Sequence, residues 1–111
     1  MTTLSACHAG DIGDARVVTL GGVEDLSAVS GIEAHVWRNG TIATLSAAVT
    51  DAEAREVTIQ LGTDAEDWLP AGPALGVWEG QVEATFIDGS ELTWPNVGDA
   101  VFYLEVVREF G

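Results

Sequence analysis

The chain has one cysteine and two histidines, the residues that could act as a thiol nucleophile, as an imidazole base, or as sulfur and nitrogen ligands of a metal ion. Cys7 and His8 are neighbours in the sequence, and adjacent side chains rarely turn toward one substrate. A reactive cysteine needs a base partner, and a zinc site needs at least two further ligands. His35 lies far along the chain in a predicted strand, and neither histidine belongs to a nucleophile motif such as GxSxG. We therefore expect Cys7 to be a small, half-buried apolar residue.

The carboxylates also give no catalytic pattern. With 18 acidic residues in the chain, some pair falls at a spacing suitable for glycoside hydrolysis by chance alone. Glu79 and Glu83 share the polar face of a predicted strand, which favours a solvated surface. The spacing of Asp64, Glu66 and Asp67 does not match the DxDxDG pattern of ligands in a calcium-binding loop. The sequence therefore predicts a protein that is not an enzyme and has no catalytic residues, cofactor or metal site.

Four tryptophans in so short a chain suggest either packing or sugar binding. Exposed tryptophans on a sheet can form a platform on which sugar rings stack. Alternation within the predicted strand places Trp78 on the inner side together with Phe86, which favours packing. A carbohydrate-binding or adhesive module therefore stays as the alternative function.

The charge of the chain excludes two classes of partner. A net charge of −14, with four arginines and no lysine, repels nucleic acid and anionic membrane surfaces. No apolar run approaches the roughly 20 residues that span a bilayer, and the first residues do not resemble a secretory signal. We expect a product of the cytoplasm whose acidic residues serve solubility or an acidic docking surface.

The clearest structural signal is the stretch 76–95, which predicts a β-hairpin. Apolar and polar residues alternate before Asp88-Gly89, a dipeptide typical of tight hairpin turns. Asn39-Gly40 predicts a second hairpin of the same kind. A single helical turn is expected over 63–69. The runs that alternate with strand period are 16–20, 32–37, 41–49, 57–61, 76–86, 91–94 and 101–107.

These runs predict an all-β domain. About seven short strands separated by turn signals are typical of a single immunoglobulin-like antiparallel β-sandwich. The first residues show no clear period. The expected division is therefore an extended N-terminal arm over 1–13 and a sandwich domain over 14–111.

A series of short motifs runs in order along almost the whole chain. They are 10–14 (GDIGD), 23–27 (VEDLS), Trp37-Arg38, 57–61 (VTIQL), 76–81 (GVWEGQ), 86–90 (FIDGS), Thr93-Trp94-Pro95 and 102–106 (FYLEV). In the order and spacing of these motifs the chain resembles the immunoglobulin-like N-terminal domain of phage baseplate upper proteins and its stand-alone relatives among tailed-phage virion proteins.

The resemblance implies scaffolding and attachment, and it offers no catalytic residues to carry over. Its expected partners are other virion proteins, either the major capsid protein or proteins of the tail and baseplate, with self-association or lattice assembly. The chain ends at Gly111 without a fibre or receptor-binding segment. We therefore expect a small accessory subunit, a capsid decoration or a tail component, located in the virion and assembled in the host cytoplasm.

The expected interface residues are Leu4, Cys7, His8 and Ile12 in the arm, and Trp37 on the more polar face of its strand. The hypothesis is that the arm crosses onto a neighbouring subunit and anchors the domain by strand addition.

Overall fold

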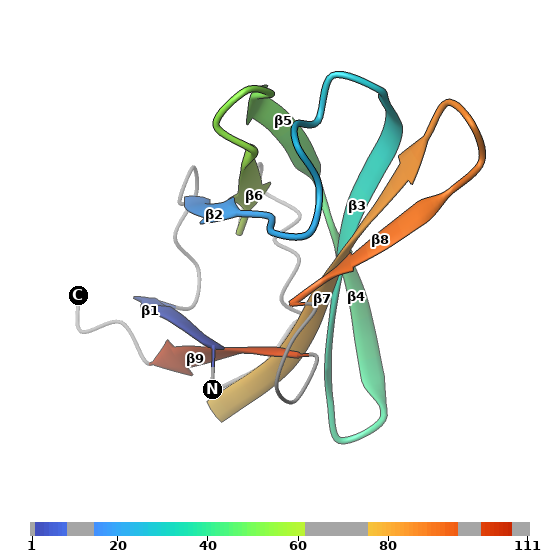
Figure 1. The fold of residues 1–111 in the computed structure, drawn as a ribbon. Coiled ribbons are helices and arrows are strands. Elements are labelled where there is room, and N and C mark those ends of the chain that lie inside the picture. Colours follow the sequence, from blue (N-terminus) through green and yellow to red (C-terminus); the bar gives the residue numbers. More distant parts are fainter. Residues whose placement is uncertain (1, 9–14, 62–75, 96–100, 108–111) are drawn as a thin grey trace.

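The computed structural model describes residues 2–8, 15–61, 76–95 and 101–107, and these form an all-β immunoglobulin-like sandwich (Figure 1). None of the described residues forms a helix long and apolar enough to cross a membrane. The strands are β1 (Thr2–His8), β2 (Ala15–Thr19), β3 (Val29–Arg38), β4 (Thr41–Leu45), β5 (Ala47–Asp51), β6 (Glu56–Gln60), β7 (Gly76–Phe86), β8 (Glu91–Trp94) and β9 (Phe102–Val107).

The strands form two sheets. The large sheet is 6-stranded in the order β1-β9-β7-β3-β4, with β8 also pairing β7, and the small sheet is 3-stranded in the order β2-β6-β5. In Figure 1 the small sheet lies over one side of the large sheet. The predicted fold class is confirmed.

Strand β7 is the centre of the large sheet. It pairs antiparallel with β3 along most of its length, with β9 over its first half and with β8 over its second half. The turn at Asp88-Gly89 joins β7 to β8, and Gly89 has φ +89°. Asn39 and Gly40 both have positive φ, as the type I′ turn requires. Both predicted hairpins are therefore confirmed.

The core lies between the two sheets and is built from the inward residues of each strand. Burying this apolar surface is the main source of stability in a domain whose single cysteine excludes an intrachain disulfide. Trp78 is the largest fully buried side chain. The buried set is Cys7, Val18, Leu20, Leu26, Ala34, Val36, Leu45, Val57, Ile59, Leu61, Trp78, Val82, Ala84, Phe102, Leu104 and Val106.

The structure divides one predicted run in two. The run 41–49 was expected as one strand, but β4 belongs to the large sheet and β5 to the small sheet. Ser46 lies between them, and its carbonyl accepts a hydrogen bond from the Gln60 amide at 2.9 Å. The chain therefore passes from one sheet to the other without the glycine or proline that would signal a break. The predicted helical turn over 63–69 lies outside the described residues.

The first part of the predicted arm is a strand of this chain's own sheet. Strand β1 runs parallel to β9, with a register shift between Leu4 and Cys7. Arg16 of the small sheet reaches this irregularity. Its Nε donates to the Ser5 carbonyl at 3.0 Å and its Nη2 to the Ala6 carbonyl at 2.7 Å. The extended conformation was predicted, but the pairing within the chain was not.

Candidate functional site

The predicted interface residues that the structure describes lie in two different environments, the core and the outer face of a sheet. Leu4 packs against the core, and Cys7 is only 3% exposed within it. His8 ends strand β1, and Ile12 lies outside the described residues. Trp37 points away from the core on β3, where both neighbours, Val36 and Arg38, belong to the opposite side of the strand. Trp37 therefore lies on the outer face of the large sheet.

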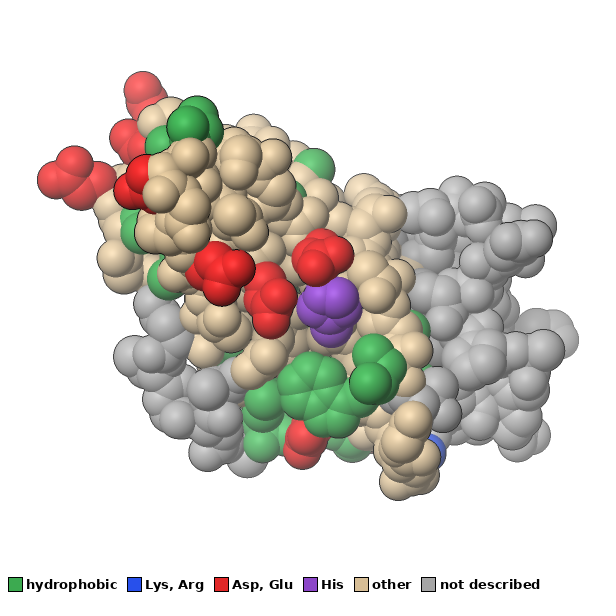
Figure 2. Space-filling view, turned by 90° about the vertical axis from the view of Figure 1, so that its right-hand side faces the viewer, with side chains coloured by type: hydrophobic (Ala, Val, Ile, Leu, Met, Phe, Trp, Pro, Cys, Tyr) green, Lys and Arg blue, Asp and Glu red, His purple; other side chains and the backbone are tan. Residues whose placement is uncertain are grey.

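This outer face is formed by the residues that alternate with the buried ones. On β3 they include Glu33, His35 and Trp37, and on β7 they include Glu79 and Glu83. The register places Glu33 opposite Glu83, and Trp37 opposite Glu79. Figure 2 shows this side of the molecule, with acidic side chains around a histidine and a hydrophobic patch beside them. The face therefore has an apolar half and a polar half.

The apolar half surrounds Trp37. Its indole Nε1 donates to Glu79 Oε2 at 3.0 Å, which fixes the ring on the sheet. Ile42 of β4 lies opposite Trp37 and is 72% exposed, and Val77 of β7 is 51% exposed. A shallow hollow of ≈ 310 Å³ lies beside the ring, and Tyr103 of β9 contributes to its lining. Exposed apolar side chains thus adjoin one oriented aromatic ring.

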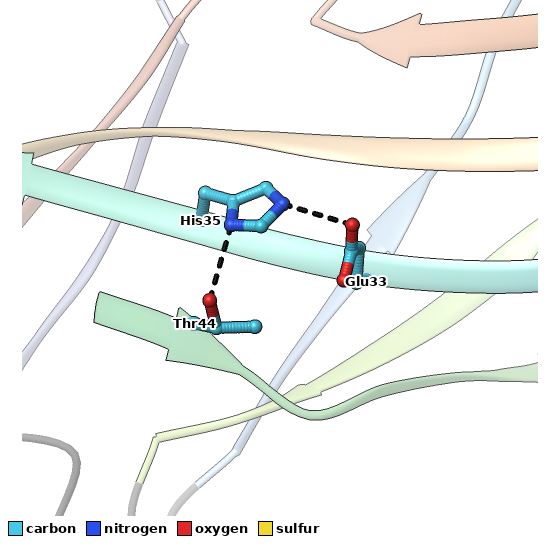
Figure 3. Close-up of polar contacts among 3 residues, drawn as sticks. All are labelled: Glu33, His35 and Thr44. Atoms are coloured by element: carbon cyan, nitrogen blue, oxygen red, sulfur yellow. Dashed lines mark hydrogen bonds and ion pairs between the residues drawn. The ribbon is translucent and has the colours of Figure 1, made fainter. Parts of the chain in front are cut away.

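The polar half is a connected set of side chains from three strands. His35 Nε2 lies 3.1 Å from Glu33 Oε1, and His35 Nδ1 lies 3.3 Å from Thr44 Oγ1 (Figure 3). Glu83 brings a second carboxylate into the group from β7. Strand β3 therefore holds the imidazole between a carboxylate on its own strand and a hydroxyl on β4.

A third feature lies at the tip of the β7–β8 hairpin. A hollow of ≈ 420 Å³ is lined by Val23, Ala28, Phe86, Ile87, Asp88 and Ser90. Ile87 is 77% exposed, and its amide donates to the Ala28 carbonyl at 2.8 Å. This bond attaches the hairpin tip to the loop between β2 and β3.

Two acidic turns of the same form lie at this end of the sandwich. The Ser27 hydroxyl donates to Asp25 Oδ1 at 2.6 Å, and the Ser90 hydroxyl donates to Asp88 Oδ1 at 2.6 Å. These hydroxyl bonds, followed by bonds from the same serines' backbone N–H groups, hold the pKa of both carboxyls below the usual value of 3.8. Both aspartates therefore stay charged further into the acid range than ordinary surface aspartates.

The tryptophans in the described part of the chain do not form the flat, exposed platform on which a carbohydrate-binding module would stack sugar rings. Trp78 is 2% exposed in the core. Trp94 is half-buried and packs on Phe102, with ring centroids 5.9 Å apart. Trp37 alone of the three described tryptophans lies on the outer face, and Trp68 lies outside the described residues.

Sequence reasoning expected Trp37 on the more polar face of its strand but did not identify the neighbours of that ring. Glu33 and His35 stand two residues apart on one strand, a spacing that the sequence displays. Their proximity to Glu83 depends on which residues of β3 and β7 pair, and short motifs do not encode that register.

Comparisons with protein-family models, with curated proteins and with solved structures find no match to this chain. Its function is therefore inferred from its motifs and its surfaces.

Proposed function

We propose that this chain is a non-enzymatic structural protein of a tailed-phage virion, a small accessory subunit that attaches to the capsid or to the tail and baseplate. The order of its motifs supports the phage assignment. The apolar half of the outer face, centred on Trp37, is the observation that supports attachment.

The attachment surface in this proposal is the sheet face and not the N-terminal strand. Strand β1 is already paired with β9 and contributes Cys7 to the core, so releasing it would open the sandwich. Trp37 is already held by Glu79, and Ile42 and Val77 are exposed beside it. Aromatic side chains fixed before binding lose little conformational entropy, and they dominate the binding energy of many protein interfaces.

Charge adds selectivity to this surface. Glu79 borders the apolar half, and Glu33 and Glu83 lie on the same face. With a net charge of −14, the chain would favour a partner surface that is basic around an apolar centre, and like-charged surfaces would be rejected.

The test is whether the chain belongs to phage particles. We expect it to co-sediment, at a fixed copy number, with particles purified on a density gradient from cultures that produce it. Trp37→Ala combined with Ile42→Ala should reduce the bound copies at least tenfold while the circular dichroism spectrum stays unchanged. Thr44→Ala, on the same face but in its polar half, is the control that should keep binding. A chain found only in the soluble fraction would exclude the proposal.

A further inference from the structure

The polar half of the outer face holds an imidazole beside two carboxylates, a combination for which attachment gives no reason. We propose that Glu33, His35 and Glu83 bind one divalent transition-metal ion of the zinc class, with an imidazole nitrogen and two carboxylate oxygens as protein ligands. This inference is independent of the proposed virion role.

The backbone brings the three ligands together. Glu33 and His35 are two residues apart on β3, so both side chains leave the same face of the sheet. The β3–β7 register places Glu83 directly opposite Glu33. As a result, one ligand atom from each of the three side chains lies within 4.8 Å of the other two. Two paired strands thus present a facial set of three ligands.

One pair of ligand atoms already has the separation that a metal requires. His35 Nε2 and Glu33 Oε1 are 3.1 Å apart. Two atoms bound to the same zinc ion at about 2.0–2.2 Å lie about 2.8–3.1 Å apart at octahedral angles and about 3.3–3.6 Å apart at tetrahedral angles. Glu83 is exposed, so its carboxylate can close the remaining gap by a change of rotamer at small cost.

The imidazole is also oriented as a ligand. Thr44 Oγ1 lies 3.3 Å from Nδ1, on the side of the ring away from Glu33. When Nδ1 carries the proton and donates it to the hydroxyl, the lone pair of Nε2 points toward the carboxylates. Metal-binding histidines are commonly held in this way through their second nitrogen. Thr44 is therefore a positioning residue, and this contact separates the group from a simple cluster of surface acids.

Electrostatics favours a cation at this position. Glu33 and Glu83 face each other across an antiparallel pair, where like charges are destabilising. A divalent ion among the three ligand atoms compensates both carboxylates at once.

The ligand set selects the class of metal. Calcium and magnesium prefer sites made only of oxygen, whereas an imidazole combined with carboxylates suits zinc and its neighbours. Three protein ligands on an open sheet face leave at least one coordination position for water.

The experiment titrates the full chain with ZnCl₂ by isothermal calorimetry and follows the His35 ring signals by NMR. We expect one ion per chain and a shift of these signals. His35→Ala and Glu83→Gln should each weaken binding more than tenfold, and Thr44→Val should weaken it about tenfold through the lost orientation. MgCl₂ in excess should not displace zinc.

Two control variants separate this site from general attraction to an acidic protein. His8→Ala removes the other imidazole, and Glu105→Gln removes an equal charge from an exposed position on β9. Both should bind zinc as the unmodified chain does. If Glu105→Gln weakens binding as much as Glu83→Gln, or if His35→Ala binds normally, the proposed site is wrong. Circular dichroism of each variant excludes loss of fold as the cause.

Discussion

The two faces of strand β7 share one backbone but have different environments, since one packs in the core and the other is exposed on the outer face of the sheet. Toward the core it presents Trp78, Gly80, Val82 and Ala84, all buried. Toward the outside, its alternate residues belong to the apolar and polar halves of the candidate site. Because successive side chains point to opposite sides of a strand, substitutions one position apart should affect different properties. The inner residues determine stability, and the outer residues are available to a partner.

The largest effect on stability is expected from Trp78→Ala. Removing the largest buried side chain creates a cavity between the sheets and should lower the free energy of unfolding by about 3–5 kcal/mol. Trp37→Ala is the matched control on the outer face and should cost less than about 1 kcal/mol, since its indole bond is exposed. Urea denaturation of both variants measures the difference. Equal losses of unfolding free energy in the two variants would show that the outer face contributes as much to stability as the core face.

A smaller effect is expected from Gly80→Ala. A Cβ atom at this position would overlap Cζ of the buried Phe102 ring, so the ring or the strand must move. Overpacking of this kind costs about 1–3 kcal/mol. Gly31→Ala on β3 is the control, because nothing lies within 4 Å of its added Cβ. It should leave the urea midpoint unchanged or raise it slightly, and a loss as large as that of Gly80→Ala would contradict this explanation.

The smallest effect concerns the hairpin tip, which belongs to neither face. The lowered pKa of Asp88 means that its bonds with Ser90 stabilise the folded state above the unfolded pKa of 3.8, and this contribution is lost as the pH falls through the folded value. Ser90→Ala should raise the pKa of Asp88 toward 3.8, because the hydroxyl bond is the main cause of the shift.

An NMR titration of the carboxyl carbons measures this change. Ser27→Ala is the matched variant, which should move Asp25 and leave Asp88 unaffected. An unchanged Asp88 in Ser90→Ala would show that the hydroxyl does not lower its pKa.

The sequence was sufficient to predict features that depend on strand alternation or on a turn dipeptide. The alternation of 76–86 correctly assigned Trp78 to the core and Glu79 and Glu83 to the outside, and Asn39-Gly40 and Asp88-Gly89 correctly located two turns. These predictions depend only on residues close to one another in the chain, so no knowledge of strand partners was needed.

Pairing between distant strands was beyond the same reasoning. The approach of Glu83 to His35 depends on the register of β3 against β7, which the sequence does not display.

The pairing of residues 2–8 as a strand of the large sheet could not be predicted either, because their alternation is irregular. Leu4 and Cys7 both turn toward the core although they are three residues apart, because the register shift between them interrupts the alternation. The bonds from Arg16 that hold this irregularity come from the other sheet.

The parallel pairing of β1 with β9 determines how the domain resists mechanical force. If the start of β1 and the end of β9 are pulled in opposite directions, the load acts along both strands. The hydrogen bonds of the whole ladder, from the Thr2–Phe102 pair to the His8–Val107 pair, are then sheared together. An antiparallel pair pulled from one end would instead open one bond at a time. Arg16 couples this terminal pair to the small sheet, so both layers of the sandwich share the load.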